Sequence, residues 1–252
     1  MKELKLRGFV TPADCGGDVA KALALAKNLE LNKVVLTGDI SCKEPLVLTS
    51  GMYLVLENCS LHADLVTPTQ ENFSFRQQFI TIEGKDSQIT GDIHIFNAHH
   101  VNILGLQIAG TLTCEYTLWG NLHDLRFSCG GLKLGRGCSN FIVQDLRSAV
   151  PACIDGSISC GRPVPGVKPD INSIVLCDSV FTTNEPAVQL GAADDCGILN
   201  IQADHVTAPH TAVQVGKGLD QPAHLFFNLT FTHLDAPQGV SYQNTALHVY
   251  EK

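Results

Sequence analysis

The chain has 252 residues, a formal net charge of −8 at pH 7 and a sequence pI near 5.6. Binding to nucleic-acid phosphates depends on clustered Lys and Arg, and this acidic chain has no such cluster, so we expect no nucleic-acid partner. No apolar run approaches the roughly 18 residues that a membrane-spanning helix needs, so we expect no membrane partner.

Charged residues occupy the start of the chain, Met1-Lys2-Glu3-Leu4-Lys5, where a signal peptide would have its apolar segment. We therefore expect a protein that is cytoplasmic as it stands, or secreted with its signal removed. The length would allow one or two domains. A single domain over residues 1–252 is predicted, because the pattern described below continues without a linker.

Residues 18–29, which follow a pair of glycines, have the apolar spacing of an amphipathic helix. One face of that helix would carry Val19, Ala22, Leu23, Ala26 and Leu29. The rest of the chain has strand-like periodicity. We predict that this helix covers one open end of a solenoid, where it would protect edge groups and core side chains.

Short segments rich in Val, Ile, Leu, Phe and Thr come next, separated by turn residues. We predict strands within residues 34–40, 52–65, 79–95, 101–108, 121–127 and 140–146, because apolar and polar residues alternate there. Two polar stretches that contain proline, 67–78 and 157–169, interrupt the pattern. These stretches are predicted to be loops that leave the solenoid.

A repeat of 25 residues marks the C-terminal third. Leu176, Ile201 and Phe226 follow one another at this step (201 − 176 = 226 − 201 = 25), and Val188 precedes Val213 by the same number. Strand-like segments at such a period, with no helical segments between them, predict an all-β fold: a right-handed, single-stranded parallel β-helix. Its core should include Leu176, Phe181, Val188, Ile201, Val206, Val213, Phe226 and Phe231.

Two aspartates share this 25-residue step. Asp195 and Asp220 follow equivalent strands, so they would stack about 4.8 Å apart on adjacent coils. Carboxylates at that distance repel by about 3 kcal/mol near a protein surface. They should then share a proton, bind a cation, or point into the solvent as ordinary turn residues. Other polar candidates in this region are Asp170, Asp194, His210 and Lys217.

The chain resembles the pectin-lyase-like superfamily, and within it the polygalacturonase-type glycoside hydrolases. The segment Asp18-Val19-Ala20-Lys21-Ala22-Leu23 is similar to the N-terminal helix pattern of that superfamily, and Asp194-Asp195-Cys196 matches the D-D-C element of the hydrolases. Other elements differ. Lys217 replaces the histidine of G-H-G, Lys168-Pro169 precedes Asp170 where the family has N-T-D, and no R-I-K follows.

This resemblance implies hydrolysis of a uronate-containing polysaccharide with inversion at the anomeric carbon. Asp195 would be the general acid, and Asp194 and Asp220 would activate water. His210, Asp170 and Trp119 would contact the polysaccharide or oligosaccharide, and no cofactor would be needed. In a lyase, the sibling activity, Ca²⁺ would neutralise the uronate and Lys217 would remove a proton.

A different class of function is a non-catalytic β-helix that binds glycans or serves as a structural module, as in phage and viral fibres. Exposed Gln, Asn, His, Thr and Asp would bind sugar hydroxyls. Trp119, with Tyr116 nearby, is the main aromatic platform, although it could also be a corner residue that covers a coil. No metal site is predicted, because His99 and His100 would point to opposite faces of a strand.

The ten cysteines allow two interpretations. An even number suits five disulfides in a secreted protein, but a chain of this size needs no such bonds to be stable. The interpretation that we favour is that of free cysteines acting as small hydrophobic residues. The oligomeric state is left open by the sequence.

Overall fold

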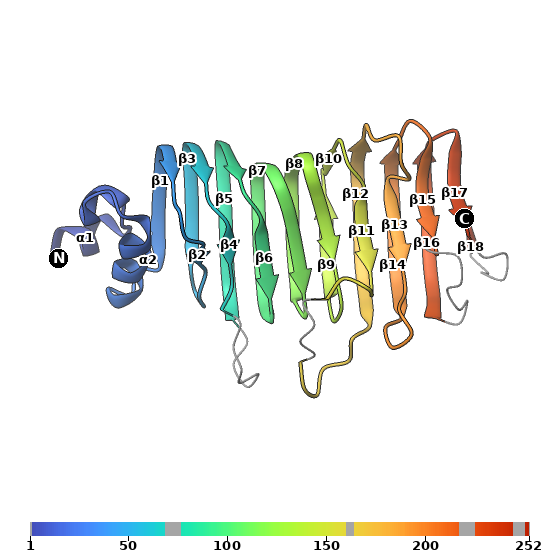
Figure 1. Cartoon of the computed structure of the whole chain (residues 1–252), viewed down its shortest axis with the longest axis horizontal. Helices are drawn as coiled ribbons and strands as arrows, with labels where there is room; N and C mark the ends of the chain where they lie inside the picture. The colour runs from blue at the N-terminus through green and yellow to red at the C-terminus, as the bar shows by residue number, and fades with distance from the viewer. Residues whose placement is uncertain (1, 69–76, 160–163, 217–224, 244–249, 252) are drawn as a thin grey trace.

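The protein is a parallel β-helix, as the sequence predicts. A computed structural model describes residues 2–68, 77–159, 164–216, 225–243 and 250–251. The strands lie side by side along the long axis, with the helices at the N-terminal end (Figure 1). All pairs of named strands are parallel, because each strand stacks on the equivalent strand of the preceding coil.

The elements follow one another without a long helix between strands. They are α1 (Lys2–Arg7), the 3₁₀ helix η1 (Pro12–Cys15), α2 (Val19–Asn28), β1 (Lys33–Ser41), β2 (Leu46–Val47), β3 (Tyr53–His62), β4 (Leu65–Val66), β5 (Gln77–Thr90), β6 (Ile93–Phe96), β7 (Ala98–Glu115), β8 (Leu118–Leu134), β9 (Ser139–Gln144), β10 (Arg147–Ser148), β11 (Ala152–Asp155), β12 (Ile171–Phe181), β13 (Val188–Gly191), β14 (Ile198–Thr207), β15 (Thr211–Val215), β16 (Phe226–Asp235), β17 (Gln238–Tyr242) and β18 (Tyr250–Glu251).

Helix α2 covers the first coil, which confirms the predicted capping helix. It begins where the Asp18 carboxylate accepts a hydrogen bond from the Lys21 backbone N–H at 3.0 Å, an N-cap that satisfies a free donor of the first turn. Its buried face consists of Val19, Ala22, Leu23 and Ala26, which join the core of the β-helix. The end of the solenoid is thereby shielded from water.

The core consists of columns of apolar side chains at matched positions on successive coils. One column contains Leu54, Ile82, Ile103, Leu122, Val143, Leu176, Ala203 and Phe231, and all of these side chains are buried. The eight core residues that the sequence analysis named are also buried. Fully burying a side chain such as Leu or Ile contributes about 1.5–3 kcal/mol, so these columns hold the coils together.

The coils are longer than the predicted step along most of the C-terminal third. Ile201 pairs with Ile174 and with Leu229, steps of 27 and 28 residues (201 − 174 = 27; 229 − 201 = 28), whereas the step of 25 holds between Val188 and Val213. The step of 27 differs from 25 by two residues, which leaves a strand residue on the same face. The step of 28 differs by three, but the left-handed residue Asn228 interrupts the alternation, so Phe226 and Leu229 are both buried. The predicted core is therefore right, although the predicted pairing of Leu176 with Ile201 is wrong.

The two predicted loops lie partly within the described residues. Residues 157–159 and 164–169 form turns and coil between β11 and β12. In the first stretch, Gln77 and Gln78 already belong to β5, and residues 69–76 lie outside the described residues.

No disulfide joins any two of the nine described cysteines, and Cys160 lies outside the described residues. Burial raises the thiol pKa of Cys59 to about 11 and those of Cys138 and Cys196 to about 12. These thiols stay protonated at neutral pH and act as small hydrophobic groups.

Candidate functional site

Polar and aromatic side chains gather at two corners that flank the outward face of one sheet. At each corner a residue in the left-handed conformation turns the chain, and the residues of successive coils stack on one another. The aromatic–amide corner has φ values between 54° and 58° and consists of Phe79, His100, Trp119, Asn140, Ser173, Asn200 and Asn228. The pairing of the flanking residues places these side chains in one column.

The second corner lies five residues further along the chain on most coils, and seven residues further on the coil of β5. The acid–histidine corner has φ values between 48° and 65° and consists of Asp86, Gly105, Asp124, Asp145, Asp178, His205 and His233. Asp tolerates the left-handed conformation better than most residues, and Gly adopts it freely. The backbone of this corner therefore favours the short acidic side chains that it carries.

Three rings stack on one another at the aromatic–amide corner. The centroids of Phe79 and His100 lie 4.9 Å apart with an interplanar angle of 17°, and those of His100 and Trp119 lie 5.0 Å apart at 21°. His99 packs edge-on against Trp119 at 4.4 Å. Phe79 is 59% exposed and Trp119 is 46% exposed. The rings therefore form an apolar edge that solvent reaches.

Amide side chains continue the same column on the later coils. Asn140 takes the position after Trp119, so one face of the indole adjoins a small polar side chain instead of a fourth ring. The Asn200 side chain donates a hydrogen bond from Nδ2 to Oδ1 of Asn172, the residue before Ser173, at 2.8 Å, and Asn228 Nδ2 donates to Asn200 Oδ1 at 2.6 Å. The amides are thus held in order along the solenoid axis.

Large rings are unusual in the left-handed conformation, which costs about 1–2 kcal/mol for residues other than Gly, Asn and Asp. Phe79 and Trp119 adopt it with φ of 57° and 55°, where the later coils use Asn or Ser. Strained backbone of this kind tends to occur at functional sites. The rings at this corner are therefore candidates for a binding role.

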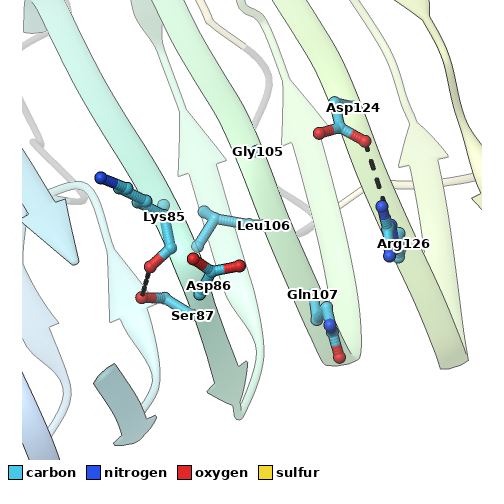
Figure 2. A pocket seen from close by; sticks show the side chains of 9 residues that line it. Lys85, Asp86, Ser87, Gly105, Leu106, Gln107, Asp124 and Arg126 are labelled. Atoms are coloured by element: carbon cyan, nitrogen blue, oxygen red, sulfur yellow. Dashed lines mark hydrogen bonds and ion pairs between the residues drawn. The ribbon is translucent and has the colours of Figure 1, made fainter. Parts of the chain in front are cut away.

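A pocket of about 260 Å³ interrupts the acid–histidine corner (Figure 2). It is present because Gly105 has no side chain between the carboxylates of Asp86 on β5 and Asp124 on β8. The two carboxylate positions are two coils apart, which corresponds to about 9–10 Å. Arg126 also lines the pocket, with its Nε 3.9 Å from Asp124 Oδ1.

Carboxylates pair with histidines further along the same corner. His123 Nε2 lies 3.0 Å from Asp145 Oδ2. In the later coils Asp204 lies beside two histidines: its Oδ1 is 2.8 Å from His233 Nδ1, and its Oδ2 is 3.1 Å from His205 Nδ1. Thr232 donates a hydrogen bond to Asp204 Oδ1 at 2.6 Å. The hydrogen bonds from Thr232 and His233 lower the pKa of Asp204 to about 2.

The carboxylates that the sequence singles out lie elsewhere on the molecule. Asp194 and Asp195 follow β13, and Asp195 Oδ2 accepts a hydrogen bond from Arg136 Nη1 at 2.8 Å. The same guanidinium donates through Nε to the Gly156 carbonyl oxygen at 2.8 Å. Arg136 therefore ties the Asp195 turn to the chain segment after β11. A catalytic role for Asp194 and Asp195 stays a prediction.

Of the remaining predicted site residues, Asp170 lies beside the Asp195 turn. Asp170 accepts a hydrogen bond from the Gly197 N–H at 2.8 Å, and His210 is exposed at the turn before β15. Trp119 lies in the ring stack of the aromatic–amide corner. Lys217 and Asp220 lie outside the described residues, so their stacking with Asp195 stays a prediction.

One prediction about geometry is wrong. His99 and His100 were expected on opposite faces, but their Nδ1 atoms lie 2.7 Å apart because His100 has a φ of 56°. The same turn at His205, with φ of 51°, brings its imidazole ring beside the Asp204 carboxylate. Sequence analysis missed Phe79, Asp86, Asp204 and His233 for this reason. A recurring Asn, Asp or His next to each apolar strand segment was the signal that could have identified the corners.

Comparisons with known proteins identify structural likeness without a family. No protein-family model matches the chain, and no curated protein matches it in sequence. Two solved structures of PfbA, a surface protein and adhesin of Streptococcus pneumoniae, are similar. One is 11% identical over 93% of this chain and 99% of that chain with a TM-score of 0.43, and the other is 12% identical over 90% and 83% with a TM-score of 0.46.

Within the described part of the chain, no helix is both long and apolar enough to cross a membrane.

Proposed function

We propose that this protein is a non-catalytic β-helix that binds an elongated glycan along the aromatic–amide corner. The observation that carries the proposal is the half-exposed indole of Trp119, at the point where the stacked rings give way to the amide column. One face of the indole stacks on His100 and the other adjoins Asn140, so the apolar face of a sugar ring would pack across the exposed edges of the stacked rings. The sugar hydroxyls would bond to amides on the next coils.

The outward face of the sheet supplies further polar groups next to the rings. Thr81, Asn102 and Asn121 form the neighbouring column, and Asn102 donates a hydrogen bond to Thr81 at 3.4 Å. A formal net charge of −8 disfavours a polyanionic ligand. We therefore infer that neutral oligosaccharides bind more tightly than uronate polymers.

The binding experiment uses a panel of neutral and uronate-containing oligosaccharides of increasing length. Trp119→Ala should lower the affinity for a bound glycan at least tenfold. Val180→Ala, which removes an exposed apolar side chain from β12 outside the corner, should leave it unchanged. Equal binding by Trp119→Ala and wild type would refute the proposal, as would the absence of binding to the whole panel.

Glycan length gives a second test of the binding direction. Asn140 is adjacent to Trp119, whereas Asn200 lies two coils further, about 9–10 Å away. Asn140→Ala should lower the affinity for every glycan that binds. Asn200→Ala should lower the affinity only for glycans long enough to reach Asn200. Equal effects of both variants on the shortest bound glycan would contradict a ligand that runs along the axis.

A second candidate function is hydrolysis of a polysaccharide, and the pocket at Gly105 favours it. Asp86 and Asp124 line that pocket from backbone positions about 9–10 Å apart, and inverting glycosidases hold their two carboxyl groups about 6.5–9.5 Å apart. The test measures new reducing ends and, for a lyase, the absorbance of unsaturated products with and without Ca²⁺. Turnover that Asp86→Asn abolishes would place catalysis in the pocket, and turnover that Asp195→Asn abolishes would place it at the predicted Asp194–Asp195 turn.

We also propose that the chain is a divergent member of the pectin-lyase-like superfamily. Support comes from the parallel β-helix together with a helix at residues 19–28 that precedes the first coil.

A further inference from the structure

The last coils of the acid–histidine corner bring three potential metal ligands together. Asp204 and His205 lie on β14 and His233 lies on β16, so the group links two coils. One ligand atom from each residue lies within 4.8 Å of the others. The two imidazole rings stack with centroids 4.4 Å apart and an interplanar angle of 17°.

The spacing of these atoms fits a metal ion. Ligands bound at about 2.0–2.2 Å in tetrahedral or octahedral geometry lie about 3.0–3.5 Å from one another. The two distances from the Asp204 carboxylate to the histidine Nδ1 atoms, 2.8 Å and 3.1 Å, are close to that spacing. A small shift of the exposed rings would therefore open room for an ion between the three side chains.

The surroundings prepare the carboxylate for this role. Thr232, which pairs with Asp204 on the next coil, donates a hydrogen bond to its Oδ1 and so fixes its orientation. Groups that orient a ligand in this way typically raise metal affinity 10–100-fold. Each imidazole can bind a metal through Nδ1 when its ring proton occupies Nε2.

We propose that Asp204, His205 and His233 form a binding site for a divalent transition-metal ion of the zinc class. Two imidazoles and one carboxylate favour Zn²⁺, Ni²⁺ or Co²⁺ over Ca²⁺ and Mg²⁺, which prefer oxygen ligands. Water would complete the coordination, because both histidines are exposed. The bound ion would join the coil of β14 to the coil of β16 and so stabilise the C-terminal end of the solenoid.

The experiment uses the full chain without a histidine tag and titrates it with ZnCl₂ alone by calorimetry. We expect one saturable site per chain, whose affinity falls at least tenfold in His205→Ala and in His233→Ala and by roughly tenfold in Thr232→Val. His123→Ala is the matched control, because His123 also pairs with one carboxylate, that of Asp145, but no other imidazole among the described residues stacks on it. This control should bind zinc as the wild type does.

Two further measurements keep the outcome unambiguous. Cobalt(II) absorbance distinguishes nitrogen and oxygen ligands from thiolate, since Cys129 is an exposed free cysteine. Zinc should raise the thermal midpoint of the wild type and of His123→Ala but not that of His233→Gln, a variant whose fold is checked by circular dichroism. The proposal is overturned if no saturable zinc binding occurs, if the His233 variants bind as tightly as wild type, if thiolate bands dominate, or if Ca²⁺ binds as tightly as Zn²⁺.

Discussion

The aromatic–amide corner and the acid–histidine corner flank the same sheet and have the same left-handed backbone, but they carry different chemistry. The first presents rings and amides that hydrogen-bond or stack along the axis. The second presents carboxylates and imidazoles that pair across coils. The solenoid thus fixes the position at which a side chain stacks, whereas the residue type decides whether the column binds an apolar surface or a charged group.

Both corners depend on the core beneath them, and the largest expected effect comes from breaking it. Ile201 is a buried residue of β14 that lies between Asn200 and Asp204 in the sequence. Ile201→Ala should therefore lower the free energy of unfolding by about 2–5 kcal/mol. Urea denaturation measures the change. Ile142→Ala, at an exposed position on β9, should change it by less than about 0.5 kcal/mol. A similar loss in both variants would contradict the assigned inward and outward faces.

The second expected effect comes from placing a side chain at Gly105, where the acid–histidine corner has a gap. Gly105 has a φ of 65°, and a Cβ there would lie 2.6 Å from the Gly84 carbonyl oxygen. Gly105→Ala should therefore destabilise the protein by about 2–4 kcal/mol, through left-handed strain and overpacking. Gly16→Ala is the control, because Gly16 has a φ of 67° with no atom within 4 Å of its Cβ position. That variant should lose only the strain, about 1–2 kcal/mol.

A smaller effect tests whether the rings of the aromatic–amide corner interact. A double-mutant cycle on His100→Ala and Trp119→Ala should give a coupling of about 0.5–1.5 kcal/mol, typical of aromatic pairs. Phe227 is exposed on β16 and belongs to no ring pair found among the described residues. A cycle of Trp119→Ala with Phe227→Ala should be additive within about 0.5 kcal/mol. Additivity in both cycles would mean that the stack contributes nothing to stability.

The smallest expected effect is a pH-dependent loss of stability at the acid–histidine corner, which the aromatic–amide corner should not show. The pKa of Asp204 is lowered from 3.8 to about 2 in the folded protein, so its contribution to stability is fully present above about pH 4 and is lost as the pH falls through 2. The contribution of Asp204 to the free energy of unfolding should stay below about 1 kcal/mol, because its partners His205 and His233 are exposed to solvent. Thermal midpoints of wild type and Asp204→Asn should differ at pH 6 and converge at pH 2. Asn200→Ala, at the other corner, should show a difference that does not depend on pH over this range.

The fold was predictable because the apolar columns repeat in the sequence. Val188 and Val213 show the repeat directly, and the inward facing of Ile201 survives an error of two residues in the coil length. The capping helix was predictable from its apolar spacing, which α2 confirms. These features depend on local periodicity, which a single sequence contains.

The candidate site was less predictable, because left-handed residues change which face a side chain occupies. Alternation along an ideal strand placed His99 and His100 on opposite faces, and it gave no reason to join Asp204 to His205 and His233. Trp119 was identified as an aromatic platform from its rarity, but its partners Phe79 and His100 are 40 and 19 residues away (119 − 79 = 40; 119 − 100 = 19). Coils of unequal length hide such neighbours from a search at a fixed step.

The pocket at Gly105 limits how the sequence can evolve, because the backbone of Gly84 lies against Gly105. A Cβ at Gly84 would lie 2.3 Å from the Leu106 side chain and 2.7 Å from the Gly105 carbonyl oxygen, and a Cβ at Gly105 would lie 2.6 Å from the Gly84 carbonyl oxygen, so the backbone at each position leaves no room for a Cβ at the other. A lineage could not fill this pocket by one substitution at a time without passing through a strained protein. Homologues that lose the pocket should therefore differ in the length of this coil, and the glycine pair and the coil length should be inherited together.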